Sequence, residues 1–174
     1  AANGLRVQGW MASSGVLPTP GAGNLRDVRV RLGEAIPARA TTRVELADNL
    51  DAAAVGPVSV TLDLWDSLGR PVSVELVFER TGANQWQWTA YYDGNVRGAD
   101  TLIFESNGAL STGSTHSIVI PGYMLGGADD LALDLDFSGL TQYAAPTTVK
   151  MLSQDGYPAG ELQRFSIDTA GVIT

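Results

Sequence analysis

Apolar and polar residues alternate along several short stretches of the chain, separated by turn-forming residues about every eight to twelve positions. The clearest stretch is 58–64, where every second residue is valine or leucine, so these side chains share one face of a strand. The turn formers at 66–69 then lead into a second alternating stretch at 72–78, which predicts a β-hairpin. Helical periodicity is almost absent, and the pattern predicts antiparallel β structure throughout. Further strands are expected at 85–92, 101–104, 117–120, 131–137, 147–152 and 162–167.

Two segments have the composition of connections rather than strands. Residues 11–24 are rich in Gly, Ser and Pro and are expected to form a linker. Residues 121–128 are rich in glycine and are expected to form an exposed loop.

The strand predicted at 85–92 carries the strongest aromatic cluster. Trp86 and Trp88 would share one face, while Gln85, Gln87 and Thr89 would share the other. The polar opposite face favours burial of the two tryptophans, where large aromatic side chains contribute much of a core. Two tryptophans on one face also fit a platform on which sugar rings stack. A carbohydrate-binding β-sandwich module is therefore an alternative function.

Composition excludes several classes of site. The chain of 174 residues has no cysteine, so it has neither disulfides nor thiolate metal sites, and it has no apolar run long enough to cross a membrane. Its net charge of −8 argues against nucleic acid as a partner. Residues 1–43 carry six arginines against two acidic residues, a balance of +4, and the remainder carries five basic and 17 acidic residues, a balance of −12. Such opposite charges can be complementary between neighbouring copies of the chain, although uneven surface charge of no functional consequence explains them as well.

Residues that commonly perform chemistry are scarce. His116 is the only histidine, lacks a nucleophile elbow and is expected to be a surface residue. The carboxylates Asp129, Asp130, Asp134 and Asp136 lie close enough in sequence to suggest a calcium site. Alternation explains the last two as the solvent face of a half-buried strand. We therefore predict no catalytic residue, no metal site and no cofactor, and we expect that the protein is not an enzyme.

Three motifs occur in order along the chain. They are Trp-Asp-Ser-Leu-Gly at 65–69, Gly-Leu-Thr-Gln at 139–142, and Gln-Asp-Gly-Tyr at 154–157 followed by Phe-Ser-Ile-Asp at 165–168. In this combination the chain resembles bacterial flagellar hook proteins. The residues of the two turn motifs are expected to set strand geometry: Asp66, Ser67, Gly69, Gln154, Asp155, Gly156 and Tyr157.

The resemblance implies two small antiparallel β domains of sandwich or barrel type, with the outer one inserted into the inner one. The inner domain would comprise residues 1–39 and 146–174, with 4–10 as its outward strand, and the outer domain would comprise 40–145. Hook proteins also have long terminal helices, which have no counterpart here. The chain is therefore expected to be a middle piece of a longer protein, and a monomer by itself.

The resemblance further implies a structural subunit, exported unfolded, that polymerises into a curved tube outside the cell and passes torque from motor to filament. The implied partners are other copies of the chain in a helical polymer and the axial, cap and junction proteins of the flagellum. Another axial protein of the rod type is the second possibility. The expected contact residues lie in the basic stretch and in the glycine-rich loop: Arg26, Arg29, Arg31, Arg39, Arg43, Gly122, Tyr123, Met124 and Leu125.

Overall fold

The computed structural model describes residues 8–10, 25–28 and 35–161. The chain divides into two compact units, unit 1 formed by 1–35 with 161–174 and unit 2 formed by 36–160. In unit 1, the strand β1 (Gln8–Gly9) pairs antiparallel with β2 (Arg26–Asp27). A further pair joins β3 (Ala35–Ile36) to β13 (Gly160–Glu161), where the chain passes from one unit to the other. The linker expected at 11–24 and the strand expected at 162–167 lie outside the described residues, and the predicted domain boundaries at 39/40 and 145/146 stay a prediction.

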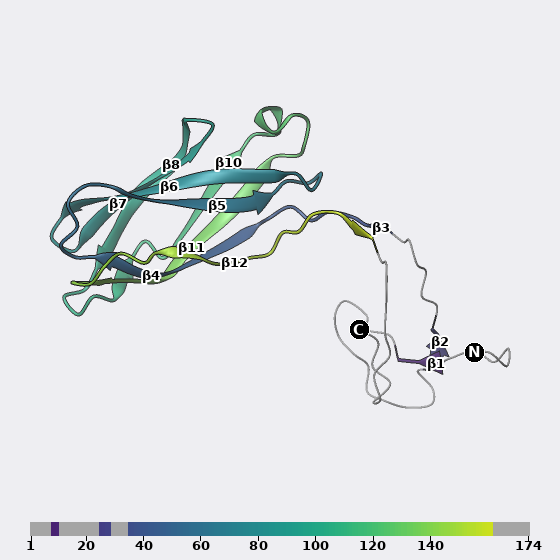
Figure 1. Ribbon diagram of the computed structural model, residues 1–174, viewed down its shortest axis with the longest axis horizontal. Helices are drawn as coiled ribbons and strands as arrows, with labels where there is room; N and C mark the ends of the chain where they lie inside the picture. The colour runs from purple at the N-terminus through teal and green to yellow at the C-terminus, as the bar shows by residue number, and fades with distance from the viewer. Residues whose placement is uncertain (1–7, 11–24, 29–34, 162–174) are drawn as a thin grey trace. The chain divides into compact units, whose positions relative to one another are not determined.

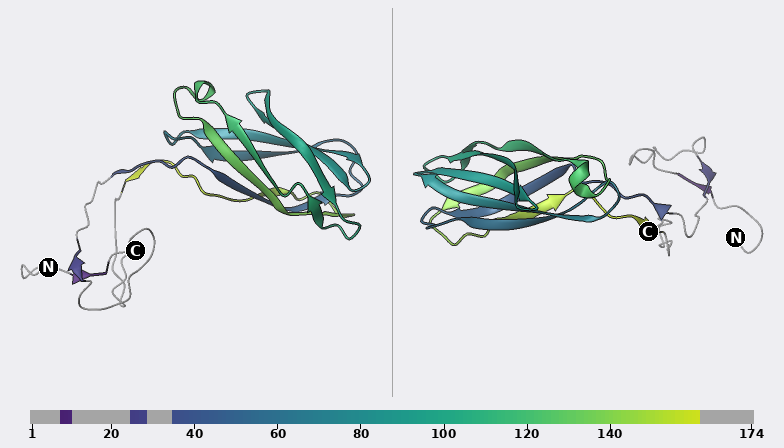
Figure 2. Two further views of the ribbon diagram at one scale, coloured as in Figure 1. Left: turned by 180° about the vertical axis from the view of Figure 1, so that it is seen from behind. Right: turned by 90° about the horizontal axis from the view of Figure 1, so that it is seen from above.

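Unit 2 consists of two β-sheets packed face to face (Figures 1 and 2). The five-stranded sheet is a series of hairpins between sequence neighbours, in the order β5 (Val58–Trp65), β6 (Pro71–Gly82), β7 (Gln85–Tyr92), β8 (Asn95–Phe104) and β9 (Leu110–Thr112). The four-stranded sheet has the order β10 (Thr115–Ile120), β11 (Leu131–Tyr143), β4 (Arg43–Asp51) and β12 (Lys150–Gln154). The predicted all-β class is confirmed.

The hairpins of the five-stranded sheet agree with the alternating pattern. β5 and β7 fall where the pattern places them, and the turn at 66–69 joins β5 to β6. Strands β8 and β11 are longer than expected. β11 continues past Phe137 because a register irregularity between Asp136 and Gly139 lets the strand stay paired to β4.

The four-stranded sheet departs from the prediction in two ways. Its strand β4 was not expected, and β4 pairs parallel with β11, so the expectation of antiparallel pairing throughout is wrong for this pair. The physical reason is topological. β12 lies beside β4 in the antiparallel sense. β11 lies on the other side of β4, and the chain reaches it only after it has formed the five-stranded sheet. Parallel strands need such long connections.

The core lies between the two sheets and is aromatic at its centre. Trp86 and Trp88 are at most 1% exposed, so they are core residues and cannot be a platform for sugar rings. The indole Nε1 of Trp86 donates to Gln142 Oε1 at 2.7 Å, which satisfies its polar group inside the core. The ring of Trp88 packs against Phe137, with ring centroids 5.2 Å apart.

Two further expectations about single segments need correction. His116 is not a surface residue: its side chain is 17% exposed, lies against the rings of Trp88 and Phe137, and has its Nδ1 3.2 Å from Asp100. The loop 121–128 is not uniformly exposed, because it forms a 3₁₀ helix, η2 (Gly122–Leu125), in which Leu125 turns into the core. Leu125 is buried because its side chain is apolar.

Candidate functional site

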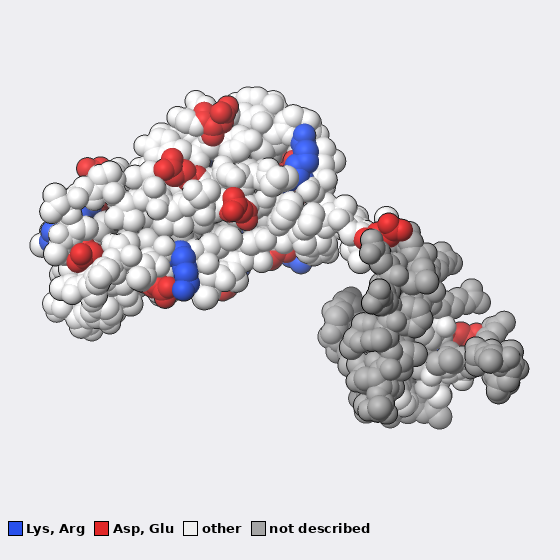
Figure 3. Space-filling view, in the orientation of Figure 1, with Lys and Arg blue, Asp and Glu red and all other residues white. Residues whose placement is uncertain are grey.

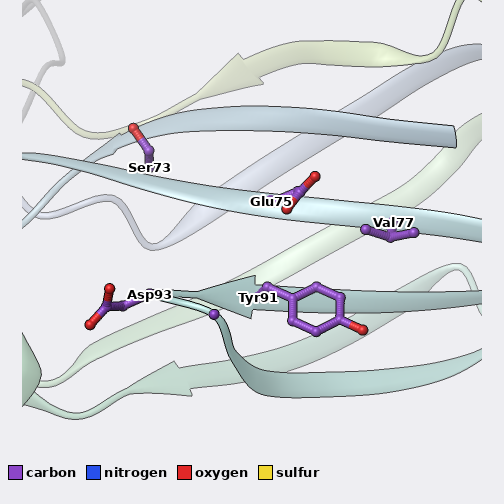
Figure 4. Close-up of a pocket in the computed structure, with 6 residues that line it drawn as sticks. Ser73, Glu75, Val77, Tyr91 and Asp93 are labelled. Carbon is purple, nitrogen blue, oxygen red and sulfur yellow. The ribbon is translucent and has the colours of Figure 1, made fainter.

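A shallow, open concavity of unit 2 lies on the outer face of the five-stranded sheet. It has a volume of about 450 Å³ and is lined by Ser73, Glu75, Val77, Tyr91, Asp93 and Gly94. Figure 4 shows these side chains spread along β6, β7 and the turn after β7. Its lining pairs no nucleophile with a base. Chemistry therefore does not identify this groove as an active site.

Carboxylates elsewhere are arranged as the solvent side of strands. Asp134 accepts a hydrogen bond from Ser117 Oγ at 2.5 Å, and Asp136 accepts one from Arg43 at 2.8 Å. Within the part of the chain that the structure describes, no group of three His, Asp or Glu residues is placed to hold a metal ion. Across the same residues, no helix is long and apolar enough to cross a membrane.

A dense set of polar contacts lies at the end of unit 2 where the chain enters and leaves it. We call this set the polar junction and define it as segments 39–43, 66–70 and 154–157. The two turn motifs singled out in the sequence are its second and third segments. The structure therefore brings together two motifs that are far apart in the chain, on either side of an entry segment that the sequence did not single out as their partner.

The turn at 66–70 is organised by one buried carboxylate. Asp66 Oδ1 accepts from the backbone N–H groups of Leu68 and Arg70, both at 2.9 Å, and Oδ2 accepts from Arg70 Nε at 2.9 Å. Burial raises the pKa of Asp66, but the hydrogen bonds from Arg70 and Leu68 outweigh it and hold the pKa below its usual value. The Asp66 carboxylate is therefore charged and holds its own turn together by hydrogen bonds.

This turn also reaches its neighbours. The Arg70 guanidinium donates to the backbone carbonyl of Leu125, and Ser67 Oγ accepts from the backbone N–H of Asp129 at 3.0 Å. Gly69 has φ +77°, and a methyl group there would lie 2.8 Å from Ala38 Cβ. The turn is therefore fixed against both the η2 loop and the entering chain.

Asp155 links the exit of the chain to its entry. Its Oδ1 accepts from the backbone N–H groups of Thr42 at 2.7 Å and Arg43 at 2.9 Å, and its Oδ2 accepts from Thr42 Oγ1 at 2.7 Å and from the Arg39 guanidinium at 2.8 Å. Burial raises the pKa of Asp155, but the hydrogen bonds from Arg43 and Thr42 and the charge of Arg39 outweigh it and lower the pKa to about 2. The side chain is therefore an anion that holds three residues of the entry segment.

The residues beside Asp155 complete the link. Gln154 Oε1 accepts from Thr41 Oγ1 at 2.8 Å and from the backbone N–H of Gly156 at 2.6 Å. Tyr157 and Arg39 exchange two backbone hydrogen bonds of 3.0 Å. A methyl group on Gly156 would lie 2.3 Å from Thr41 Oγ1, so only glycine fits between the two segments without displacement.

The residues expected to form contacts between subunits lie in different environments. Arg39 is paired with Asp155 and Arg43 with Asp136, each at 2.8 Å, while Arg26 is exposed in β2. Arg29 and Arg31 lie outside the described residues. In the η2 loop Gly122 and Leu125 are buried, Met124 is partly buried, and Tyr123 is 82% exposed. A role of these residues in contacts between copies stays a prediction.

Acidic and basic side chains are distributed differently over the surface of unit 2. Figure 3 shows acidic side chains spread over the visible face of unit 2, with basic side chains at a few separate places. Ion pairs join Arg43 to Asp136 and Lys150 to Asp48 on the four-stranded sheet. Arg43 and Lys150 are therefore already engaged in holding that sheet.

Comparison with known proteins gives a consistent result. A family model described as the flagellar basal body protein FlaE D2 domain matches residues 34–157. The flagellar hook protein FlgE of Treponema pallidum is 31% identical over 99% of this chain and 50% of that protein. FlgE of Borreliella burgdorferi is 30% identical over 99% of this chain and 47% of that protein. The chain thus spans about half the length of these relatives.

One solved structure is a weak match. A 32 kDa fragment of the flagellar hook protein FlgE from Caulobacter crescentus is similar over 57% of this chain and 46% of that one, with a TM-score of 0.47 and 21% identity. The family model, by contrast, covers most of the chain and contains all three segments of the polar junction. The chain belongs to the flagellar hook protein family, through its FlaE D2 domain.

Proposed function

We propose that the chain is part of a structural subunit of the bacterial flagellar hook. The subunit assembles with other copies of itself into a curved, flexible tube that acts as a universal joint between motor and filament. The observation that carries the proposal is the family match over residues 34–157, which includes both turns of the polar junction. The names of the matched relatives favour a hook protein over a rod-type axial protein.

The fold suits a mechanical role. The turn at 154–157 bonds the exit of the sandwich to its entry, and the turn at 66–70 packs closely against both connections at the same end. A domain attached in this way moves as one body on the chain that carries it, because its two connections are bonded to each other. That property is useful in a tube whose subunits change their spacing with every turn, while no catalytic constellation is needed.

Contacts between copies would be numerous and individually modest, so that they re-form as the tube bends. The exposed candidates for such contacts are Arg26 and Tyr123, together with Arg29 and Arg31 in sequence. Arg39 and Arg43 already hold Asp155 and Asp136, and we assign them to the stability of unit 2 instead. The polymer would lie outside the cell, joined to other axial, cap and junction proteins, after export of the unfolded chain.

Immunogold electron microscopy of the source cells tests the assignment. An antibody raised against this chain should label only a short curved segment between the cell body and the flagellar filament. Label spread over the cell surface, or absent from flagella, would overturn the proposal.

Charge reversal in the full-length protein tests the contact residues. Arg29→Glu with Arg31→Glu should shorten or abolish hooks seen by electron microscopy, while the exposed Arg80→Glu, on unit 2, should leave them unchanged. Normal hooks and normal swimming in the double variant would remove electrostatic attraction through these arginines from the proposal.

A further inference from the structure

The entry and exit strands of unit 2 are hydrogen-bonded neighbours. Unit 2 begins at residue 36 and ends at residue 160, and β4 pairs antiparallel with β12 from Val44↔Gln154, nearest the entry, to Ala47↔Lys150. Hydrogen bonds in an antiparallel pair run perpendicular to the strands. A force that separates residues 36 and 160 would first part β3 from β13 and the bonded pair Arg39 and Tyr157. It would then reach the β4–β12 pairs one after another, starting at Val44↔Gln154. That geometry offers little resistance, because each bond bears the load alone.

The polar junction lies directly before this vulnerable ladder. Four hydrogen bonds from the entry segment end on the carboxylate of Asp155, and their donors belong to Arg39, Thr42 and Arg43. Because two of the donors are backbone N–H groups of consecutive residues, the carboxylate cannot leave one of them while keeping the normal geometry of the other. The bonds are loaded in parallel, and they must break together before the ladder is exposed.

Thr41 extends the link to the other sheet. Its side chain donates to Gln154 Oε1, its Oγ1 accepts from the backbone N–H of Trp65 at 3.0 Å, and its own N–H donates to the Trp65 carbonyl at 2.9 Å. Trp65 is the last residue of β5, the edge strand of the five-stranded sheet. Thr41 is fully buried, so water does not compete for these bonds.

We propose that Gln154 and Asp155, with Thr41 and Thr42, form a mechanical latch that keeps unit 2 closed when its entry and exit are pulled apart. With the latch in place, several hydrogen bonds must break at the same time before unit 2 opens. Without it, the hydrogen bonds would break one after another. This inference rests on the proposed function for its purpose, since a subunit that bears torque has its two connections pulled. The resistance of unit 2 to opening is a property of the chain alone and does not depend on that function.

Single-molecule force spectroscopy on the full chain tests the latch. The natural sequence has no cysteine, so Ala35→Cys with Glu161→Cys provides two exposed attachment points that flank unit 2. Asp155→Asn should raise the opening rate under this load by about tenfold or more, the change expected when hydrogen bonds to a charged group are lost.

The matched control is Asp136→Asn, which also changes a hydrogen-bonded carboxylate to an amide, but this carboxylate joins β11 to the Arg43 side chain and makes no bond to the exit segment. It should change the opening rate by less than about threefold. A second loading geometry uses Val55→Cys with Ser106→Cys, both exposed in turns at the opposite end of the sandwich. Under that load the two asparagine variants should open at similar rates.

The zero-force emission of the buried Trp86 and Trp88 reports whether each variant is folded. A folded Asp155→Asn chain that opens no faster than Asp136→Asn would overturn the latch. Where Asp155→Asn does not fold, Arg39→Ala removes only one of the four donors, and its opening rate should rise by about twofold to tenfold. An unchanged rate in that variant would equally overturn the proposal. Neither outcome depends on gold labelling of the hook, so the failure of one proposal leaves the other standing.

Discussion

The interior of unit 2 and its polar junction hold the same polypeptide together by different means. The interior relies on apolar area: Trp86, Phe78 and Phe137 are fully buried between the sheets. The junction relies on directed bonds, some between buried groups such as Thr41 and others between partly exposed groups, with Asp155 29% exposed and Arg39 56% exposed. Burial has no preferred direction, whereas hydrogen bonds fix which atoms face each other. The core therefore decides whether unit 2 is folded, and the junction decides how its entry and exit segments face each other.

The largest effect should come from the interior. Trp88→Ala removes a ring that packs on both Phe137 and His116 and leaves a cavity, so it should lower the free energy of unfolding by about 3–5 kcal/mol. Urea denaturation followed by circular dichroism measures this change. The exposed Tyr123→Ala should stay within about 0.5 kcal/mol of the parent. A loss below about 1 kcal/mol in Trp88→Ala would contradict the dominance of the interior.

The next effect concerns close packing inside the junction. Gly156→Ala would bring a methyl group to 2.3 Å from Thr41 Oγ1 and 2.7 Å from the Thr41 backbone nitrogen, so it should cost about 1–3 kcal/mol. Gly160→Ala is the control, because its nearest neighbour would be Ile36 Cβ at 4.0 Å. Equal stability of the two variants in urea would show that the junction adapts more readily than its geometry indicates.

A falling pH should weaken the hydrogen bonds of the polar junction before it affects the packing of the interior. The folded-state pKa of Asp155 is about 2 against a usual value of 3.8, and the pKa values of Asp66 and Asp136 are also lowered. Between these values the unfolded chain binds more protons than the folded one, so stability is complete above about pH 4 and falls as the pH drops towards 2. The share from Asp155 should be roughly 1–2 kcal/mol after allowance for solvent screening.

Denaturation midpoints measured at intervals from pH 5 to pH 2 would reveal this loss. Asp155→Asn should be less stable than the parent at pH 5 and should show a shallower decline. A decline as steep as that of the parent would mean that Asp155 does not contribute to it.

The smallest effect is expected on the open groove of the five-stranded sheet. Glu75→Gln changes a carboxylate on the solvent face of β6 that makes no ion pair among the described residues, so stability should change by less than about 0.5 kcal/mol. Urea denaturation beside Asp155→Asn would sharpen the contrast. A loss in Glu75→Gln as large as that in Asp155→Asn would show that carboxylates contribute irrespective of their bonding.

Local patterns predicted the parts of the fold that are held by neighbours in sequence. Strand β5 alternates cleanly and ends at a turn of Asp, Ser and Gly, and β7 sets two tryptophans against a face of Gln and Thr. Strand β4 escaped prediction because its apolar positions Val44 and Leu46 are followed by Ala-Asp-Asn, and Asp48 adopts φ 82°. Only its partners β11 and β12 show why this segment is a strand.

The sequence predicted two of the three segments of the polar junction. The sequence identified 66–69 and 154–157 as turns, because glycine beside Asp or Gln has a local meaning. It did not identify Thr41 and Thr42 as partners of those turns, since threonines in an ordinary polar stretch give no local signal. The partial burial of His116 was missed for a related reason: it depends on Trp88 and Phe137, which reach it from other strands.

The parallel pairing of β4 has a consequence for the order in which unit 2 can fold. Arg43 meets Asp136 across 93 positions of sequence, and Thr42 meets Asp155 across 113, whereas the strands β5 to β9 meet their neighbours through short turns. Contacts between distant residues form slowly, because a long loop must close first. The five-stranded sheet can therefore assemble early, while β4 waits without a partner until the last third of the chain arrives. We therefore expect closure of the sandwich to come late, after β11 and β12 are available to pair with β4.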